Sequence, residues 1–167
     1  MTILKYGAPS LRRTSQRVEK FDVDLEKLVA DMFETMYAAP GVGIAAPQVG
    51  FNIRLIVIDT SGDKDPEQKI ILCNPRIIAS EGMQNGEEGC LSVPDFSENV
   101  TRPMNVTIEA QDIKGATFKL EEEGLLARAI CHEIDHLDGI MFIDRISALK
   151  RALVLGKIKK KIRAGKW

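Results

Sequence analysis

His132-Glu133-Ile134-Asp135-His136 is the most informative stretch of this chain. It contains both of the 2 histidines among the 167 residues, and they stand at positions i and i+4. On an α-helix these positions project from the same face, so both imidazoles can bind one metal ion while Glu133 lies at the edge of that face. The spacing therefore predicts a metal-binding helix with a carboxylate beside the metal, rather than two unrelated surface or core histidines.

The residues on either side extend this helix. Glu121-Glu122-Glu123 places negative charge at its N-terminus, where the helix dipole favours anions, and Gly139 marks its end. Leu125 and Ala129 fall on or near the face of the histidines and give the metal a small apolar neighbourhood. Three apolar residues point away from that face, into the expected core: Ile130, Ile134 and Leu137.

Length and composition set limits on the class of protein. A chain of 167 residues, of which 44% are hydrophobic, is long enough for one domain with a packed core over residues 1–167. The formal net charge of −1 gives no electrostatic reason to expect binding to DNA or to an anionic membrane. No apolar stretch reaches the roughly 18 residues that span a bilayer. The odd number of cysteines and the lack of a signal peptide predict reduced thiols in the cytoplasm.

Two further helices are expected, one on each side of the middle of the chain. Asp22 can cap a helix whose apolar residues recur at helical spacing from Leu25 to Tyr37, before Pro40-Gly41 ends the pattern. Ser147 can cap a last helix, so residues 147–167 are expected as a basic C-terminal helix or tail. The basic residues of this tail are Lys157, Lys159, Lys160, Lys161, Arg163 and Lys166.

The middle of the chain is expected to be rich in strands. The apolar runs Leu55–Ile58 and Ile70–Cys73 predict two of them. Residues 104–111 alternate apolar and polar side chains, and residues 112–115 can turn them back into residues 117–120 as a hairpin. Helices and antiparallel strands in separate stretches predict an α+β fold.

The small residues from Gly41 to Gly50 predict a loop. Gly41 and Gly43 by themselves are typical of a plain turn. No lysine of a phosphate-binding loop follows them, so the sequence excludes a nucleotide site of that kind.

Two histidines leave a hydrolytic metal site one protein ligand short, because such sites usually have three and keep a position open for water. After His136 the chain contains no further His, Glu or Cys, and only Asp138 and Asp144 remain. The third ligand is therefore expected upstream. A cysteine thiolate is the strongest candidate because it binds divalent transition metals well.

Cys90 is the best of the three cysteines for this role. Cys131 directly precedes His132 and so projects about 100° away around the helix. Cys73 lies within an apolar run and is expected to be a small buried core residue. Cys90 follows Gly89, which permits a close backbone approach, and the apolar residues after it can begin a strand.

Three motifs of this chain resemble those of the peptide deformylases, in the same order and at similar separations: Gly43-Ile44-Ala45-Ala46-Pro47-Gln48, Glu88-Gly89-Cys90-Leu91-Ser92 and His132-Glu133-Ile134-Asp135-His136. The flanking stretches Asp31-Met32-Phe33-Glu34-Thr35-Met36-Tyr37 and Gly124-Leu125-Leu126 are also similar to those of bacterial members. The resemblance spans nearly the whole chain. It implies antiparallel β-sheets packed around a central metal-binding helix, with an N-terminal and a C-terminal helix.

The resemblance also implies an activity, namely removal of the formyl group from the N-terminal methionine of nascent peptides. One divalent ion would be bound by Cys90, His132 and His136, with Fe²⁺ expected first and Zn²⁺, Ni²⁺ or Co²⁺ as alternatives. Glu133 would accept and return the proton. The backbone N–H of Leu91 and the side-chain amide of Gln48 would stabilise the negative charge that develops on the formyl oxygen.

Residues of the three motifs and of the metal-binding helix are implied to bind the N-formyl-methionyl peptide. They are Val42 and Gly43 along the substrate channel, Glu88 beside Cys90, Leu125 and Ala129 on the floor of the methionine pocket, and Arg128 near its rim. Bacterial members often carry an apolar residue in place of Arg128. We therefore expect this arginine to change the polarity of the rim and the peptide preference.

Two alternatives and one further partner belong to the sequence hypothesis. A small metallopeptidase would use the same helix, and a non-catalytic protein could use Cys90 only to tie a structural metal to it. The basic tail is explained most simply as a solvated helix end. The sharper hypothesis is contact with ribosomal RNA, because clustered Lys and Arg bind phosphates and the substrate emerges from the ribosome.

Overall fold

The computed structural model describes residues 1–167, and its elements alternate between helices and antiparallel strands. The helices are α1 (Val23–Ala38), α2 (Gly124–Leu137) and α3 (Ala148–Arg163). The strands are β1 (Gly43–Ala45), β2 (Leu55–Ile58), β3 (Ile70–Glu81), β4 (Gln84–Cys90), β5 (Val93–Arg102), β6 (Asn105–Gln111) and β7 (Thr117–Glu123). The predicted α+β fold is confirmed.

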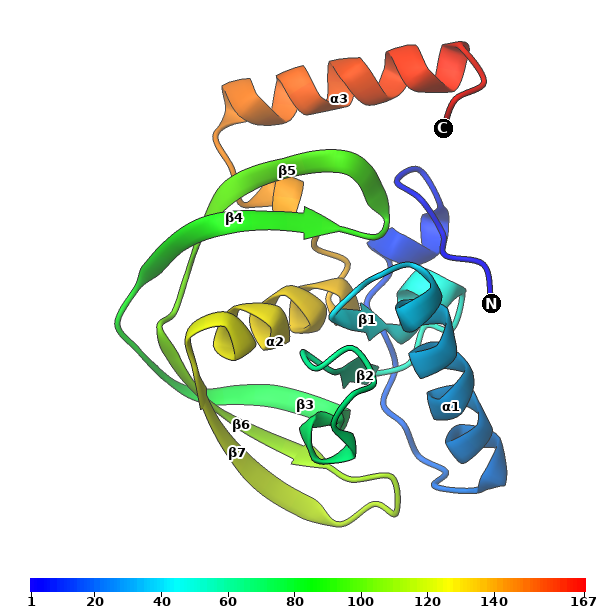
Figure 1. Cartoon of the computed structure of the whole chain (residues 1–167), viewed down its shortest axis with the longest axis vertical. Helices are drawn as coiled ribbons and strands as arrows, with labels where there is room; N and C mark the ends of the chain where they lie inside the picture. Colours follow the sequence, from blue (N-terminus) through cyan, green and yellow to red (C-terminus); the bar gives the residue numbers. More distant parts are fainter.

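The strands form two separate antiparallel sheets. One has five strands in the order β1-β2-β3-β6-β7, and the other is the two-stranded sheet β4–β5. Figure 1 shows α2 between these two sheets, with α1 at one end of the larger sheet and α3 along the outer side of β5. The helix that carries the two histidines is thus central, as the resemblance implied.

β2 shows why its sequence is apolar at every position. Successive side chains of a strand point to opposite faces, and here both faces are covered. Ile56 and Ile58 lie in an apolar cluster with α2, whereas Leu55 and Val57 lie in a second cluster with α1. All four residues are 0% exposed. Helices on both sides therefore fix this part of the sheet. The apolar face of α2 packs against the sheet and holds the helix in place.

The ends of α1 and α3 follow the predicted capping. The side chain of Asp22 accepts a hydrogen bond from the backbone N–H of Leu25 at 3.1 Å. The hydroxyl of Ser147 accepts one from the N–H of Lys150 at 3.3 Å. Both bonds satisfy donors at a helix N-terminus that have no partner within the helix. None of the helices combines the length and apolar character needed to span a lipid bilayer.

The structure differs from the sequence prediction at three strands, which are new or longer than expected because a neighbouring strand pairs with them. Glu121–Glu123 complete β7, opposite Thr107 to Asn105 of β6, and do not form the first turn of α2. β3 continues past Cys73 to Glu81 because β6 pairs with that extension. Gly43–Ala45, within the predicted loop, form β1 because they pair with β2.

The β4–β5 hairpin was not predicted as two strands. β4 contains Gly86 and Gly89 and is mostly polar, so its sequence lacks the β-branched and apolar residues typical of strands. Pairing with β5 provides its stability, and Val93 and Val100 of β5 pack into a third apolar cluster with residues that follow α2. This hairpin is the element that brings Cys90 to α2.

Candidate metal centre and active site

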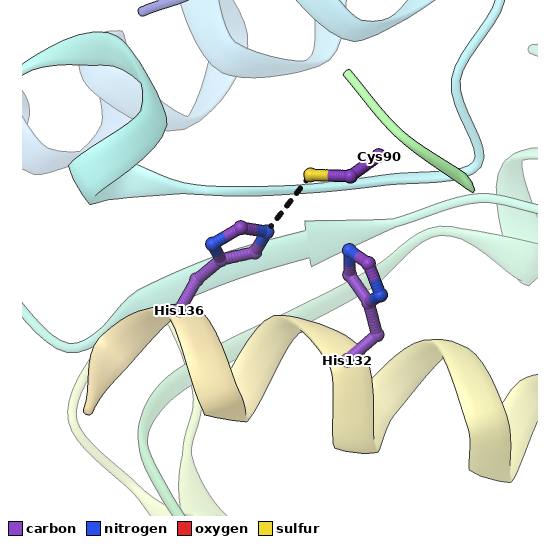
Figure 2. Close-up of side chains that lie close together, drawn as sticks. All are labelled: Cys90, His132 and His136. Atoms are coloured by element: carbon purple, nitrogen blue, oxygen red, sulfur yellow. Dashed lines mark hydrogen bonds between the residues drawn. The ribbon is translucent and has the colours of Figure 1, made fainter. Parts of the chain in front are cut away.

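Cys90, His132 and His136 converge at one point between β4 and α2. One ligand atom from each of the three residues lies within 4.8 Å of those of the other two. The sulfur of Cys90 is 3.3 Å from Nε2 of His136. Figure 2 shows both imidazole rings rising from α2 toward the Cys90 sulfur. The tertiary structure thus brings together the three residues that the sequence selected as metal ligands.

The end of β4 has an irregular register that directs Cys90. Glu88 and Gly89 pair with Glu98 and Ser97 of β5, but Cys90 pairs with Val93 after a register shift. Such an irregularity bends a strand and turns the following side chains. It separates Cys90 from the regular ladder and points its thiol at the helix.

Glu88 orients the first histidine. Its Oε2 is 2.9 Å from Nδ1 of His132, which leaves Nε2 of this ring as the nitrogen that can bind a metal. Arg102 donates to both carboxylate oxygens, at 2.7 and 2.9 Å. Burial disfavours the charged form of Glu88, but the hydrogen bonds from Arg102 and His132 outweigh it and lower its pKa to about 2. Glu88 therefore remains an anion that accepts a hydrogen bond from His132.

Arg102 and Asp135 are two functional residues that the sequence interpretation missed. Arg102 is 3% exposed and also donates to Oδ2 of Asp135 at 2.6 Å. Arg145 donates to both oxygens of Asp135, at 2.8 and 2.6 Å. This network joins β4, β5 and α2 below the metal ligands. Asp135 stood within the motif between the histidines, but no local pattern indicated its partner Arg102.

Glu133 is a buried carboxylate with one free oxygen. It is 5% exposed, and its Oε2 has no hydrogen-bond partner. Burial raises its pKa to about 7, although the neighbouring His132 acts in the opposite direction. A Cβ at Gly43 would lie 2.8 Å from Oε1 of Glu133, so only glycine allows β1 to approach this closely. The carboxylate is thus confined beside the metal ligands in a state that can take up or release a proton.

Gln48 points its amide toward the same place. Its Oε1 accepts from the backbone N–H of Ala45 at 2.8 Å, which leaves the NH₂ group facing the site. That group donates to Oγ of Ser92 at 3.1 Å and is 3.7 Å from the sulfur of Cys90. Gln48 is 1% exposed. Ser92, which is fully buried and holds the amide in place, was not selected from the sequence.

A cavity of about 680 Å³ opens above this site. That volume is in the range of small-molecule and peptide side-chain pockets. Its lining includes eleven of the sequence-selected residues: Val42, Gly43, Gln48, Glu88, Cys90, Leu91, Leu125, Arg128, Ala129, His132 and Glu133. Val42 and Leu125 are 45% and 65% exposed, so they form the mouth of the cavity, whereas Ala129 is buried.

Arg128 does not lie at the rim, where the sequence placed it. It is 6% exposed and donates to Oε1 of Glu88 at 2.9 Å and to the carbonyl of Val100 at 2.8 Å. A buried guanidinium is stable here because these acceptors replace water. The expectation of a charged rim was wrong, because the side chain turns inward to Glu88, and nothing in the sequence indicated that these two residues pair.

The residues present fit a divalent transition metal. Two imidazoles and a thiolate are a donor set that such ions prefer, and three protein ligands leave a position for water. Burial, together with the positive charge of nearby groups, lowers the pKa of His136 well below its ordinary value, which favours the neutral imidazole that a metal binds. Cys73 and Cys131 are buried elsewhere, and burial raises the pKa of each thiol to about 11.

A buried Cys/His/His set beside a carboxylate, at the bottom of a cavity between a helix and two sheets, defines the class of metal-dependent hydrolases. Comparison with known proteins gives the family. The model of the polypeptide deformylase family matches residues 1–152, and the chain belongs to this family.

Relatives and solved structures agree with this assignment. The peptide deformylase of Acidobacterium capsulatum is 54% identical over 165 residues, which cover 99% of this chain and 97% of that protein. The crystal structure of a peptide deformylase from Legionella pneumophila superposes with a TM-score of 0.91 at 46% identity, over 98% of this chain and 96% of that one. A peptide deformylase from Synechococcus elongatus, solved in complex with actinonin, gives a TM-score of 0.90 at 39% identity, over 95% and 87% of the two chains.

Peptide deformylases are metal-dependent enzymes that remove the N-formyl group from nascent peptides, and this chain is such a hydrolase. The activity implied by the sequence resemblance is thereby confirmed. The small metallopeptidase and the non-catalytic metal protein are not supported.

Proposed function

We propose that Cys90, His132 and His136 hold the metal ion of this deformylase and that Glu133, Gln48 and Leu91 act on the formyl group. The observation that carries the proposal is the convergence of the three ligand atoms within 4.8 Å, at the bottom of the cavity and next to a buried carboxylate. When bound, a divalent ion at this position polarises the formyl carbonyl and lowers the pKa of water.

We propose Fe²⁺ as the resident metal, with Zn²⁺, Ni²⁺ and Co²⁺ as alternatives that the same ligands accept. The thiolate of Cys90 and the two imidazoles form a borderline-soft set, for which geometry and metal supply matter more than raw affinity. Kinetic constants of the protein loaded anaerobically with each ion in turn would rank them. A higher kcat/KM with Zn²⁺ than with Fe²⁺ would contradict the choice.

Glu133 is the group that moves the proton in this proposal. Its free Oε2 has no partner within the protein, and its position next to His132 keeps it beside the metal ligands. It takes a proton from the attacking water and gives it to the departing amine. Gly43 lets β1 approach the carboxylate closely, which limits the movement of Glu133.

Gln48 and Leu91 stabilise the negative charge that develops on the formyl oxygen. The amide of Gln48 is fixed by Ala45 and Ser92 before substrate binds, so little reorganisation is needed during the reaction. Leu91 follows Cys90 directly, at the irregular end of β4, where its backbone N–H can serve as a second donor. Preorganised donors of this kind are a major source of rate acceleration.

The cavity provides the methionine pocket. Leu125 and Ala129 supply its apolar surface near the histidines, and Val42 and Gly43 line the channel on the opposite side. A methionine side chain is flexible and apolar, and it fits a pocket of about 680 Å³ with room for the following residues. Glu88, which also lines the cavity, acts through His132.

Release of formate from a formyl-methionyl peptide tests the assignment. We expect the Fe²⁺-loaded parent to release formate and Glu133→Ala to retain its metal while kcat falls by about 10² to 10⁴. Glu109→Ala, on β6 and outside the cavity, is the control with unchanged kcat. No formate from the metal-loaded parent, or full activity of Glu133→Ala, would overturn the proposal.

We also propose that α3 contacts the ribosome in the cytoplasm, where nascent chains are made. Five exposed cationic side chains, in the last turns of α3 and just after it, make no ion pair: Lys157, Lys159, Lys160, Arg163 and Lys166. They are free to bind RNA phosphates in a salt-dependent way. Replacing all five by Gln keeps the buried Ile158 in place and should abolish salt-sensitive co-sedimentation with ribosomes. Unchanged co-sedimentation would show that α3 is only solvated surface.

A further inference from the structure

Arg128 is an unusual wall residue because its charge is directed away from the cavity. It lies on α2 one turn before His132, and it is 6% exposed. Arginine is rarely buried unless it is paired. The energetic cost of burial is offset only if its donors meet acceptors of good geometry, so these contacts show what the side chain does.

The guanidinium joins both strands of the small sheet to α2. Nη1 of Arg128 donates to the carbonyl of Gly86 on β4 at 3.2 Å and to the carbonyl of Val100 on β5 at 2.8 Å. Gly86 and Val100 are direct partners in the β4–β5 ladder. The two N–H groups of this single nitrogen are thus shared among three acceptors, namely one carbonyl on each strand at the same level and the carboxylate of Glu88.

Gly86 provides the space for this contact. A Cβ at position 86 would lie 3.2 Å from Nη2, 3.4 Å from Cζ and 3.5 Å from Nε of Arg128. These nearly equal distances mean that the planar group lies flat against the glycine. A side chain at position 86 therefore requires the guanidinium to shift by a few tenths of an ångström from this contact. Gly86 and Arg128 are therefore a matched pair.

The hydrogen bonds of Arg128 are important because no apolar cluster joins α2 directly to the β4–β5 hairpin. Apolar residues of α2 such as Ile130 and Ile134 pack in a cluster with the five-stranded sheet. Val93 and Val100 of the hairpin belong to a different cluster, with residues after α2. Cys90 ends β4, whereas both histidines lie on α2, so the spacing of the ligands depends on how the hairpin is fixed to the helix.

Glu88 is held from two sides by the arginines. Arg102 donates to both carboxylate oxygens, Arg128 adds a third donor on Oε1, and Oε2 also accepts from Nδ1 of His132. With both oxygens engaged, the carboxylate cannot rotate away from the imidazole. Partners of this kind orient metal ligands, and their loss typically costs about 10- to 100-fold in metal affinity or activity.

We propose that Arg128 is a positioning residue, which clamps β4–β5 to α2 and thereby fixes both the Cys90 thiol and, through Glu88, the His132 imidazole. This inference rests on the proposed metal centre and extends it. Arg128 touches no reacting atom in this role. Its removal should loosen the metal site and the wall of the methionine pocket, so substrate affinity and metal retention change more than proton transfer by Glu133.

The test uses the Co²⁺-loaded protein and four variants: Arg128→Met, Arg128→Lys, Gly86→Ala and the double variant. We measure the rate of Co²⁺ loss to a chelator, the visible absorption of bound Co²⁺, and KM and kcat on a formyl-methionyl peptide. For Arg128→Met we expect loss of Co²⁺ about 10- to 100-fold faster, shifted absorption bands and a raised KM. Arg128→Lys should restore little, because an ammonium group cannot reproduce the planar contact with Gly86.

Gly86→Ala distinguishes positioning from general stability. This substitution removes no hydrogen-bond donor. As a single change it should speed Co²⁺ loss, because the methyl group shifts the guanidinium of Arg128. Added to Arg128→Met, it should have almost no effect on Co²⁺ loss. Arg54→Met is the matched control, because Arg54 also ties α2 to backbone, through Asp138 at 2.7 Å and the carbonyl of Pro75 at 3.3 Å. It should lower Tm without changing Co²⁺ loss or absorption.

Parental Co²⁺ loss and absorption in Arg128→Met would overturn the inference, as would equal effects of Gly86→Ala in both backgrounds. These two measurements need no turnover. If the parent binds Co²⁺ firmly but releases no formate with any metal, the proposed catalytic roles are refuted. The role of Arg128 would still be tested by the rate of Co²⁺ loss from the variants.

Discussion

Replacing Gln48 by alanine removes two hydrogen bonds from the protein interior. Oε1 of Gln48 accepts from Ala45 N at 2.8 Å, and Nε2 donates to Ser92 Oγ at 3.1 Å. Ala45 and Ser92 are both 0% exposed, so water cannot easily replace the lost partner. An unsatisfied buried donor costs about 1–3 kcal/mol. With the second bond included, we expect the free energy of unfolding to fall by about 2–4 kcal/mol, measured by urea denaturation.

Gln48→Ala should also reduce turnover, and this loss should not depend on the loss of stability or of metal. Loss of one donor to a developing oxyanion lowers kcat by about 10²- to 10³-fold, or about 3–4 kcal/mol of transition-state stabilisation. Because Gln48 is not a metal ligand, bound metal should stay near that of the parent. The assay is formate release under anaerobic conditions, with metal content measured on the same samples.

Ser92→Ala is the matched control for this prediction. It removes one of the same hydrogen bonds, worth about 1 kcal/mol, but leaves the amide donor of Gln48 in place. We expect a smaller loss of kcat than in Gln48→Ala. Parental turnover of metal-replete Gln48→Ala would refute the donor role. A loss of turnover in proportion to lost metal would instead make Gln48 a support for Cys90, whose sulfur is 3.7 Å from the amide.

Three further predictions concern confinement, acid stability and the core. Gly43→Ala puts a Cβ 2.8 Å from Oε1 of Glu133 and should displace the carboxylate. We expect kcat at saturating substrate to fall by about 10- to 100-fold. An unaltered kcat would show that the carboxylate has room to move. Burial opposes ionisation of Asp59, but hydrogen bonds, including one from Tyr37 at 2.6 Å, hold its pKa well below the usual range. This stabilisation is present above the unfolded pKa of about 3.9 and is lost as pH falls toward the folded value. Tyr37→Phe should therefore cost about 1.5–3 kcal/mol at pH 7, and the deficit should shrink below about pH 4; a pH-independent deficit in urea denaturation contradicts this reasoning. Ile130→Ala, at a position that is 0% exposed, should lower the free energy of unfolding by about 2–5 kcal/mol, and a loss under 1 kcal/mol would mean that the core collapses around the change.

Local features of the chain were predicted well because they depend on residues close in sequence. The position of the histidines on one helical face, the cap of α1 by Asp22 and the cap of α3 by Ser147 all follow from the helical repeat and from single side chains. The choice of Cys90 over Cys73 and Cys131 also came from local context. The structure places Cys90 beside the histidines and the other two in buried surroundings.

The parts that were missed depend on pairing between distant segments. β4 is a strand because β5 lies beside it, and Glu121–Glu123 extend β7 because β6 offers partners. The side chain of Arg128 could have pointed to solvent by its sequence position alone. It is buried because Glu88, Gly86 and Val100 lie within reach of it.

The donor atoms can be identified without the structure, because the residue types are written in the chain and the i, i+4 spacing follows from helical geometry. How those donors are held follows from the fold of the whole chain: Glu88 contacts His132 and is itself bound by Arg102 and Arg128. Charges of this kind are stable in the interior only when folding brings their partners into contact. Their roles therefore depend on the path of the whole chain, not on any stretch of it.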